Sequence, residues 1–172
     1  RILEPSMFGI VGMTVVFTDL AQSILDSGFG SALIQKKDRN EIDYSTCFYF
    51  NVVVGLVLYI VLFISAPYIA DFYHTEELAD VIRVISIGFV FNSLIISQNA
   101  KLSAEFKFKA SAIINIASYL ISGIVGIVLA YIGFGVLALV FQQVLACLLR
   151  VLFIEIYTKW IPMLIFSKRS FH

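Results

Sequence analysis

Charged residues are scarce in this chain of 172 residues: Asp, Glu, Lys and Arg together make up 14% of it, and the formal net charge is zero. Soluble domains carry about 25% charged and about 45–50% apolar residues. Apolar residues here reach 60%, and the mean hydropathy is +0.94. This composition excludes an ordinary soluble domain and argues against a disordered chain or a nucleic-acid partner. It predicts an integral membrane protein.

Cysteine and histidine are also rare, with two of each. Cys47 and Cys147 lie in apolar segments, which favours small buried side chains over a disulfide or a metal site. His74 and His172 are far apart in the chain. A Gly-rich phosphate loop and a nucleophile elbow are both missing from the sequence. We therefore expect no catalytic residues, no metal, no cofactor and no enzyme activity.

Long uncharged stretches predict membrane helices, because a helix needs about 20 apolar residues to cross a bilayer. Residues 44–70 and 110–149 contain no Asp, Glu, Lys or Arg. We expect helices at 7–27, 44–66, 78–100, 110–132 and 135–157, the second of them ending at Pro67. The predicted fold is an all-α polytopic membrane bundle that forms a single transmembrane domain over residues 1–172. Because the chain begins at Arg1 without a Met, we interpret it as a fragment.

Basic residues predict the orientation of the bundle in the membrane. Arg1 stands alone on one side of the expected helices, and nine basic residues lie on the other: Lys36, Lys37, Arg39, Lys101, Lys107, Lys109, Lys159, Lys168 and Arg169. The positive-inside rule places the nine in the cytoplasm. The 67–77 loop, which has no Lys or Arg, then faces outward, and Trp160 belongs to the inner interfacial belt.

Polar residues on the first helix predict a hydrated face. Gly12, Asp19, Gln22 and Asp26 are spaced seven, three and four residues apart, which places them on one side of a helix. A carboxylate at the depth of Asp19 costs roughly 2.5 kcal/mol or more unless it is hydrated, paired or protonated. We therefore expect this face to line a cavity. A protonated or hydrogen-bonded packing residue is the alternative for Asp19, and simple exposure at the inner end is the alternative for Asp26.

The last helix contributes two further cavity candidates. Gln142 and Arg150 belong to a set that recurs every four residues. Arg150 either extends its head to the interface or binds an anionic group, since a guanidinium forks onto phosphate. Arg83 follows Asp80 by three residues, which is typical of a local ion pair.

Small residues form a stripe along the helix expected at 110–132. Ser118, Ser122 and Gly126 recur every four residues within this stripe. Small side chains let helix backbones approach closely, so the stripe predicts a contact with another helix.

Five short segments resemble one family of membrane proteins. They are LEPSMFG at 3–9, DSGFGSALIQKK at 26–37, APYIADFY at 66–73, FKFKA at 106–110 and GFGVLALV at 133–140. In order and spacing they resemble the helix ends and corners of Wzx-like polysaccharide and lipopolysaccharide exporters, nearest the colanic-acid exporter branch. That group belongs to the multidrug/oligosaccharidyl-lipid/polysaccharide flippase superfamily.

The resemblance implies the N-terminal bundle of a two-bundle transporter in the bacterial inner membrane. It implies alternating access and a substrate of undecaprenyl-pyrophosphate carrying an oligosaccharide repeat unit. The expected partners are this lipid-linked substrate, membrane lipids and the remainder of the same chain, namely a first helix and a second bundle. A cation-coupled drug exporter with Asp19 as its ion site, and a non-transporting membrane scaffold, are the alternatives.

Overall fold

The computed structural model describes residues 5–26, 40–160 and 162 of the chain. They form five α-helices: α1 (Pro5–Asp26), α3 (Glu41–Phe72), α4 (Glu77–Ala104), α5 (Phe108–Ile132) and α6 (Val136–Thr158). Four of them, α3 to α6, are long and apolar enough to cross a membrane. In α1 the apolar part Gly9–Leu25 is shorter. The expected all-α polytopic bundle is thus confirmed for the residues that the structure describes.

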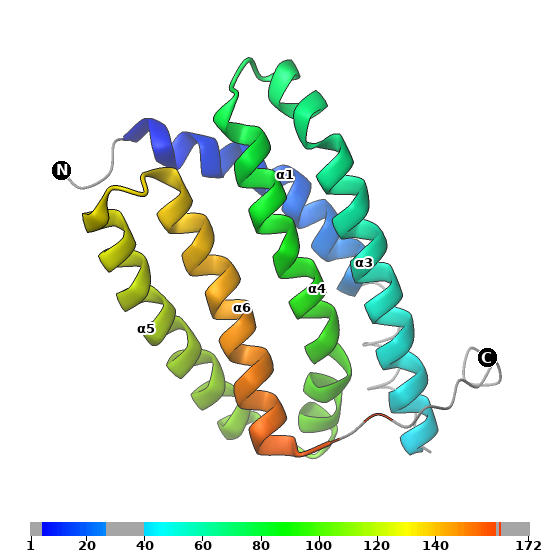
Figure 1. The fold of residues 1–172 in the computed structure, drawn as a ribbon. Coiled ribbons are helices and arrows are strands. Elements are labelled where there is room, and N and C mark those ends of the chain that lie inside the picture. The colour runs from blue at the N-terminus through cyan, green and yellow to red at the C-terminus, as the bar shows by residue number, and fades with distance from the viewer. Residues whose placement is uncertain (1–4, 27–39, 161, 163–172) are drawn as a thin grey trace.

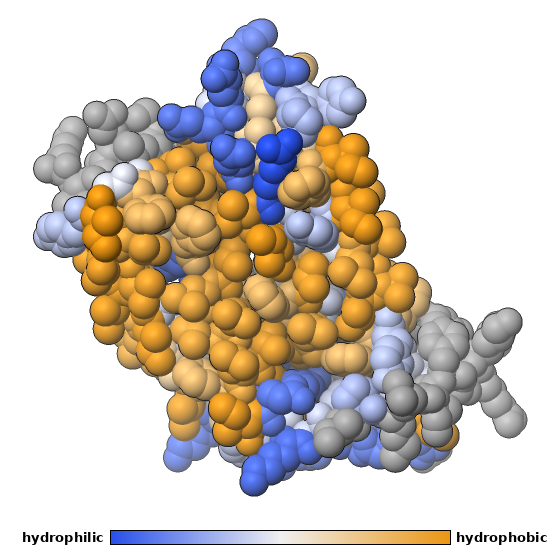
Figure 2. All heavy atoms as spheres, viewed as in Figure 1, coloured by the Kyte–Doolittle hydropathy of each residue, from blue (hydrophilic) through white to orange (hydrophobic). Residues whose placement is uncertain are grey.

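Helix α4 is the centre of the bundle. It lies between α3 and α6, α5 packs outside α6, and α1 crosses obliquely behind α4 (Figure 1). Apolar residues from α1, α3 and α4 form the largest core cluster, with Leu25, Ala66 and Leu78 among its buried members. Figure 2 shows a broad apolar belt with hydrophilic residues at both ends, as a bilayer requires.

Short corners join α3 to α4, α4 to α5 and α5 to α6. The first two place a non-glycine residue in the left-handed region, His74 at a φ of 51° and Phe106 at 55°, whereas the third uses glycine. Helix α5 ends at Gly133, whose φ of 98° is in the left-handed region that favours glycine. At the opposite end of the bundle, the backbone N–H of Asn40 donates to Asp43 Oδ2 at 3.1 Å, which satisfies a free donor where α3 begins. The basic loop at 32–39 lies outside the described residues.

The predicted end of the second helix at Pro67 is wrong. Helix α3 continues through Pro67 to Phe72, so the corner between α3 and α4 contains residues 73–76 only. Proline removes one backbone donor and crowds the preceding turn, which usually ends a helix in water. Membrane helices tolerate proline better, since neighbouring helices and local adjustments satisfy the freed carbonyl.

Candidate functional site

A polar cleft of about 530 Å³ opens among α1, α4, α5 and α6. Each of these helices contributes to a lining that mixes amides, charged groups and apolar walls. The residues with polar side chains in this lining are Thr18, Asp19, Gln22, Asn92, Asn99, Tyr119, Gln143, Cys147 and Arg150. A cleft with this lining inside an apolar belt provides hydrogen-bonding groups where the surrounding lipid has none.

The amides and Arg150 occupy successive depths in the cleft. Helices α4 and α6 run in the same direction (Figure 1), and a Cβ at Gly88 would lie 3.8 Å from Cys147 Sγ. A helix rises by about 1.5 Å per residue. Asn92 therefore lies roughly 5 Å beyond Gly88 along α4, and Arg150 lies roughly 5 Å beyond Cys147 along α6. Asn99 is about 10 Å beyond Asn92, whereas Gln143 is about 6 Å on the other side of Cys147. Polar groups therefore follow about 20 Å of the helix axes.

One hydrogen bond joins α1 to α4 inside the cleft. Asn92 Nδ2 donates to Gln22 Oε1 at 3.2 Å, between residues 70 positions apart in the chain. Asp19 is one turn before Gln22 and also lines the cleft. The polar face of α1 thus contacts the amide face of α4 through Gln22 and Asn92.

The structure separates the predicted cavity residues into three groups. Asp19, Gln22 and Arg150 line the cleft. The side chain of Asp26 is outside the described part of the chain. Gln142 lies elsewhere: a Cβ at Gly126 would be 2.9 Å from Gln142 Cβ, so this glutamine packs between α5 and α6. Its neighbour Gln143, rotated by about 100° on the helix, lines the cleft in its place.

Asn92 and Asn99 are cleft residues that the sequence analysis missed. They are seven residues apart on α4 and therefore share a face, which is the signal that could have revealed them. Their helix is the least apolar of the four long ones, with a mean hydropathy of 1.8 in its membrane window. That lower hydropathy reflects polar faces directed toward the cleft and toward α3.

The predicted small-residue stripe coincides with the buried side of α5. Ser118, Ser122 and Gly126 are the buried residues of this helix. The hydroxyls of the two serines donate to carbonyls of their own helix, Ser118 to Ile114 at 2.8 Å and Ser122 to Tyr119 at 3.2 Å. They therefore allow close packing without bonding across the contact.

Another close helix contact lies between α3 and α4. A Cβ at Gly55 would be 2.7 Å from both Cβ and Oγ of Ser93 and 3.1 Å from the carbonyl oxygen of Phe89. Ser86, Ser93 and Ser97 are buried on α4, at spacings of seven and four residues. This second set of small residues was not identified from the sequence.

Ion pairs between residues close together in the chain lie near the ends of the bundle. Arg83 Nη1 is 3.5 Å from Asp80 Oδ1, which confirms the predicted local pair, and the guanidinium also lies 5.2 Å from the ring centre of Phe63. In the α4–α5 corner, Lys107 Nζ is 2.6 Å from Glu105 Oε2. The hydrogen bond and the charge of Glu105 raise the pKa of the Lys107 ammonium.

The fold and the cleft together define a multi-pass helical membrane protein. All 172 residues match a family described as "Polysaccharide biosynthesis protein". The chain belongs to this family.

Named relatives agree with this assignment. The chain is 34% identical to the teichuronic acid biosynthesis protein TuaB of Bacillus subtilis (strain 168) over 155 residues, 89% of this chain and 32% of TuaB. It is 29% identical to the lipopolysaccharide biosynthesis protein WzxC of Escherichia coli (strain K12) over 90 residues, 52% of this chain and 18% of WzxC. It is 24% identical to the succinoglycan biosynthesis transport protein ExoT of Rhizobium meliloti (strain 1021), covering 97% of this chain and 34% of ExoT.

These relatives confirm the resemblance to Wzx-like proteins and the multi-pass bacterial membrane location. The chain spans between 18% and 34% of their lengths. No solved structure matches it significantly.

Proposed function

We propose that this chain is part of an exporter that moves lipid-linked oligosaccharide repeat units across the bacterial inner membrane for surface polysaccharide synthesis. The observation that carries the proposal is the polar cleft of about 530 Å³ inside the apolar belt. The names of TuaB, WzxC and ExoT, which refer to polysaccharide biosynthesis or transport, support it.

The polar lining of the cleft suits a sugar that loses its hydration as it crosses the membrane. Gln22, Asn92, Asn99 and Gln143 carry amides, which both donate and accept hydrogen bonds and can replace the water around sugar hydroxyls. Buried polar groups without such partners cost about 1–3 kcal/mol each. Amides at successive depths offer partners along most of a hydrocarbon layer about 30 Å thick.

Arg150 is suited to bind the phosphate groups that link the sugar to its lipid carrier. Its guanidinium can bind a phosphate oxygen pair through two parallel hydrogen bonds. We propose that it binds the pyrophosphate of an undecaprenyl carrier while the amides bind the sugar. In this proposal a second bundle supplies the opposite wall, and the two bundles alternate between inward and outward openings.

Export by the complete protein tests the role of the amides. Asn92→Leu and Asn99→Leu remove hydrogen-bonding groups from the cleft at nearly constant volume. Asn115→Leu is the matched control, since Asn115 lies on α5 and is not part of the lining. Losing one hydrogen bond to the moving sugar corresponds to about five- to tenfold slower export. The assay is surface polysaccharide in the native host at equal membrane levels. Wild-type export by both cleft variants would refute the proposal.

Asp19 supports a second candidate, a cation-coupled exporter of the same superfamily. A carboxylate at membrane depth can hold a proton or a cation during transport. If its charge is used, Asp19→Asn folds but exports less, and collapsing the proton gradient adds no further loss. Asp19→Leu is expected to do more harm if hydration of the cleft matters. If the export losses from Asp19→Asn and from collapse of the proton gradient add up, Asp19 has a role outside ion coupling. Full export by both Asp19→Asn and Asp19→Leu would mean that Asp19 is a packing residue.

A further inference from the structure

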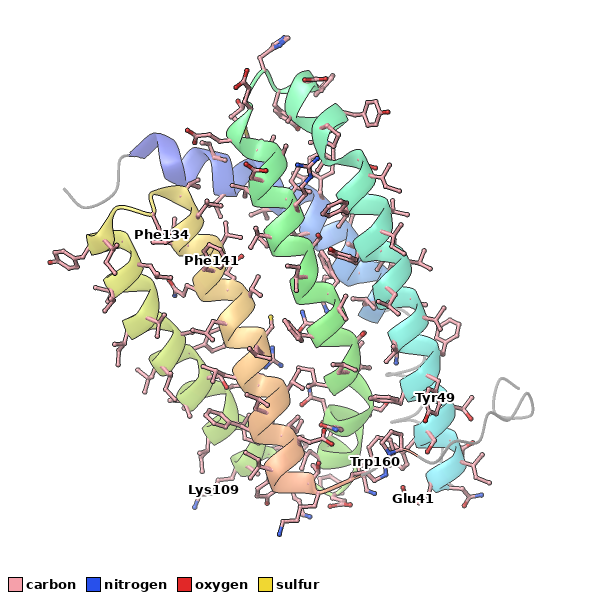
Figure 3. All side chains as sticks on the ribbon, in the orientation of Figure 1. Glu41, Tyr49, Lys109, Phe134, Phe141 and Trp160 are labelled. Atoms are coloured by element: carbon pink, nitrogen blue, oxygen red, sulfur yellow. The ribbon has the colours of Figure 1, made fainter. Side chains whose placement is uncertain are left out.

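A polar and aromatic cluster connects three distant parts of the chain at the predicted inner end of the bundle. Glu41 at the start of α3 accepts two hydrogen bonds, from Trp160 Nε1 at 2.6 Å and from Lys101 Nζ at 2.7 Å. The two donors bind different oxygens of the carboxylate. Lys101 Nζ also lies 5.6 Å from the ring centres of Tyr44 and Trp160. Figure 3 shows Glu41 and Trp160 at the same end of the bundle as Lys109.

The backbone brings Trp160 to this position by a turn at the end of α6. Lys159 has a φ of 47°, in the left-handed region, and ends the helix. Trp160 follows at once, with only 8% of its surface exposed, and its ring packs edge-on against Phe48 at 6.0 Å. A tryptophan at a lipid interface would keep its ring in the headgroup layer, as the sequence analysis expected. Here the ring is buried against α3.

We propose that Glu41, Lys101 and Trp160 form a clasp that anchors the chain leaving α6 to the beginning of α3 and the end of α4. Whatever follows Trp160 in a longer polypeptide then starts from a point fixed to two other helices. A force applied to the chain at Trp160 then acts on α3 and α4 together. This inference concerns the mechanics of the bundle and does not depend on the proposed substrate.

The hydrogen bond from Trp160 stabilises the clasp more than the ion pair between Lys101 and Glu41 does by itself. The side chain of Lys101 is 24% exposed and that of Glu41 is 45% exposed, and pairs this exposed contribute little by themselves. The indole N–H adds a charge-assisted hydrogen bond, and these are about twice as strong as neutral ones. Burial of the indole ring depends on this bond, because an indole N–H normally has a partner when buried.

The clasp is testable because Trp160 is the single tryptophan of these 172 residues. The experiment uses the complete protein in lipid nanodiscs, with any tryptophan outside this segment replaced by Phe. Indole emission and acrylamide quenching measure burial of Trp160. Trypsin cleavage after Lys159, identified by fragment mass, measures how often the adjacent chain detaches. The variants Glu41→Gln and Lys101→Met each remove one charge of the clasp, and Lys107→Met is the matched control.

We expect the two clasp variants to show red-shifted emission and cleavage after Lys159 on the order of tenfold faster. Lys107→Met also loses one lysine and one ion pair near the same end, and it should behave like the wild type. Maleimide labelling of Cys147 in the cleft, unchanged in all three variants, would show that the bundle is intact. Unchanged emission and cleavage in Glu41→Gln and Lys101→Met would overturn the proposal. Equal changes in Lys107→Met, or exposure of Cys147, would also overturn it by showing general loosening.

Discussion

Replacing Gly55 by alanine should destabilise the bundle, although alanine is the better helix former. In an open helical position the change from Gly to Ala stabilises by about 0.8–1 kcal/mol. At Gly55, however, the added Cβ would lie 2.7 Å from Ser93 Cβ and Oγ and 3.1 Å from the Phe89 carbonyl oxygen. Relaxed carbon contacts are about 3.5–4.0 Å, so α3 and α4 must separate by roughly 1 Å at this point.

The magnitude follows from the two opposing terms. Overpacking a tight contact costs about 1–3 kcal/mol, which exceeds the gain in helix propensity over most of its range. We therefore expect the free energy of unfolding to fall by about 1 kcal/mol, and at most by about 2 kcal/mol, in Gly55→Ala. Denaturant titration of the complete protein in mixed micelles measures this change. The matched control is Gly123→Ala on α5, where a Cβ would meet nothing within 4 Å, so stability should stay the same or rise.

A second substitution tests the cause. Ser93→Gly removes both atoms at 2.7 Å, so the double variant Gly55→Ala with Ser93→Gly should regain part of the lost stability. The Phe89 carbonyl remains in place and limits the recovery. Wild-type stability of Gly55→Ala, or no recovery in the double variant, would refute the close contact between α3 and α4.

Two further predictions concern packing and orientation. Gly126→Leu should reduce folded yield, because even a Cβ there would be 2.9 Å from Gln142 Cβ; undiminished yield and thermal stability would mean that this side of α5 faces open space. In a background without the native cysteines, Lys109→Cys should react with an impermeant maleimide only in inside-out vesicles and Glu76→Cys only in intact cells. The reverse pattern would invert the orientation expected from the basic residues.

Hydropathy made most of the fold predictable from the sequence. The uncharged stretch at 110–149 predicted α5 and α6, and the corner between them is at Gly133, where the backbone has a positive φ. These features are local: an apolar stretch of sufficient length must form helix in a bilayer, since its backbone groups have no water to bond. Pro67 is the exception, because its local rule applies to helices in water, and α3 continues past it.

The candidate site was only partly predictable, because helix rotation decides which side chains meet. Asp19 and Gln22 were found because a carboxylate in an apolar helix marks a polar face. Gln142 and Gln143 are neighbours with the same chemistry, and only the packing of α5 on α6 turns one toward Gly126 and the other toward the cleft. Asn92 was not predicted, because only the packing of α1 on α4 brings it to Gln22.

The sequence by itself thus determined that the chain forms long membrane helices and that the first of them carries a polar face. Only the tertiary structure decided which faces meet: Gly55 against Ser93, Gln22 against Asn92, and Trp160 on Glu41. The physical reason is the range of the forces involved. Transfer from water to lipid acts on each segment separately, whereas close packing and hydrogen bonds join residues up to 119 positions apart, whose meeting depends on the rotation and crossing of whole helices.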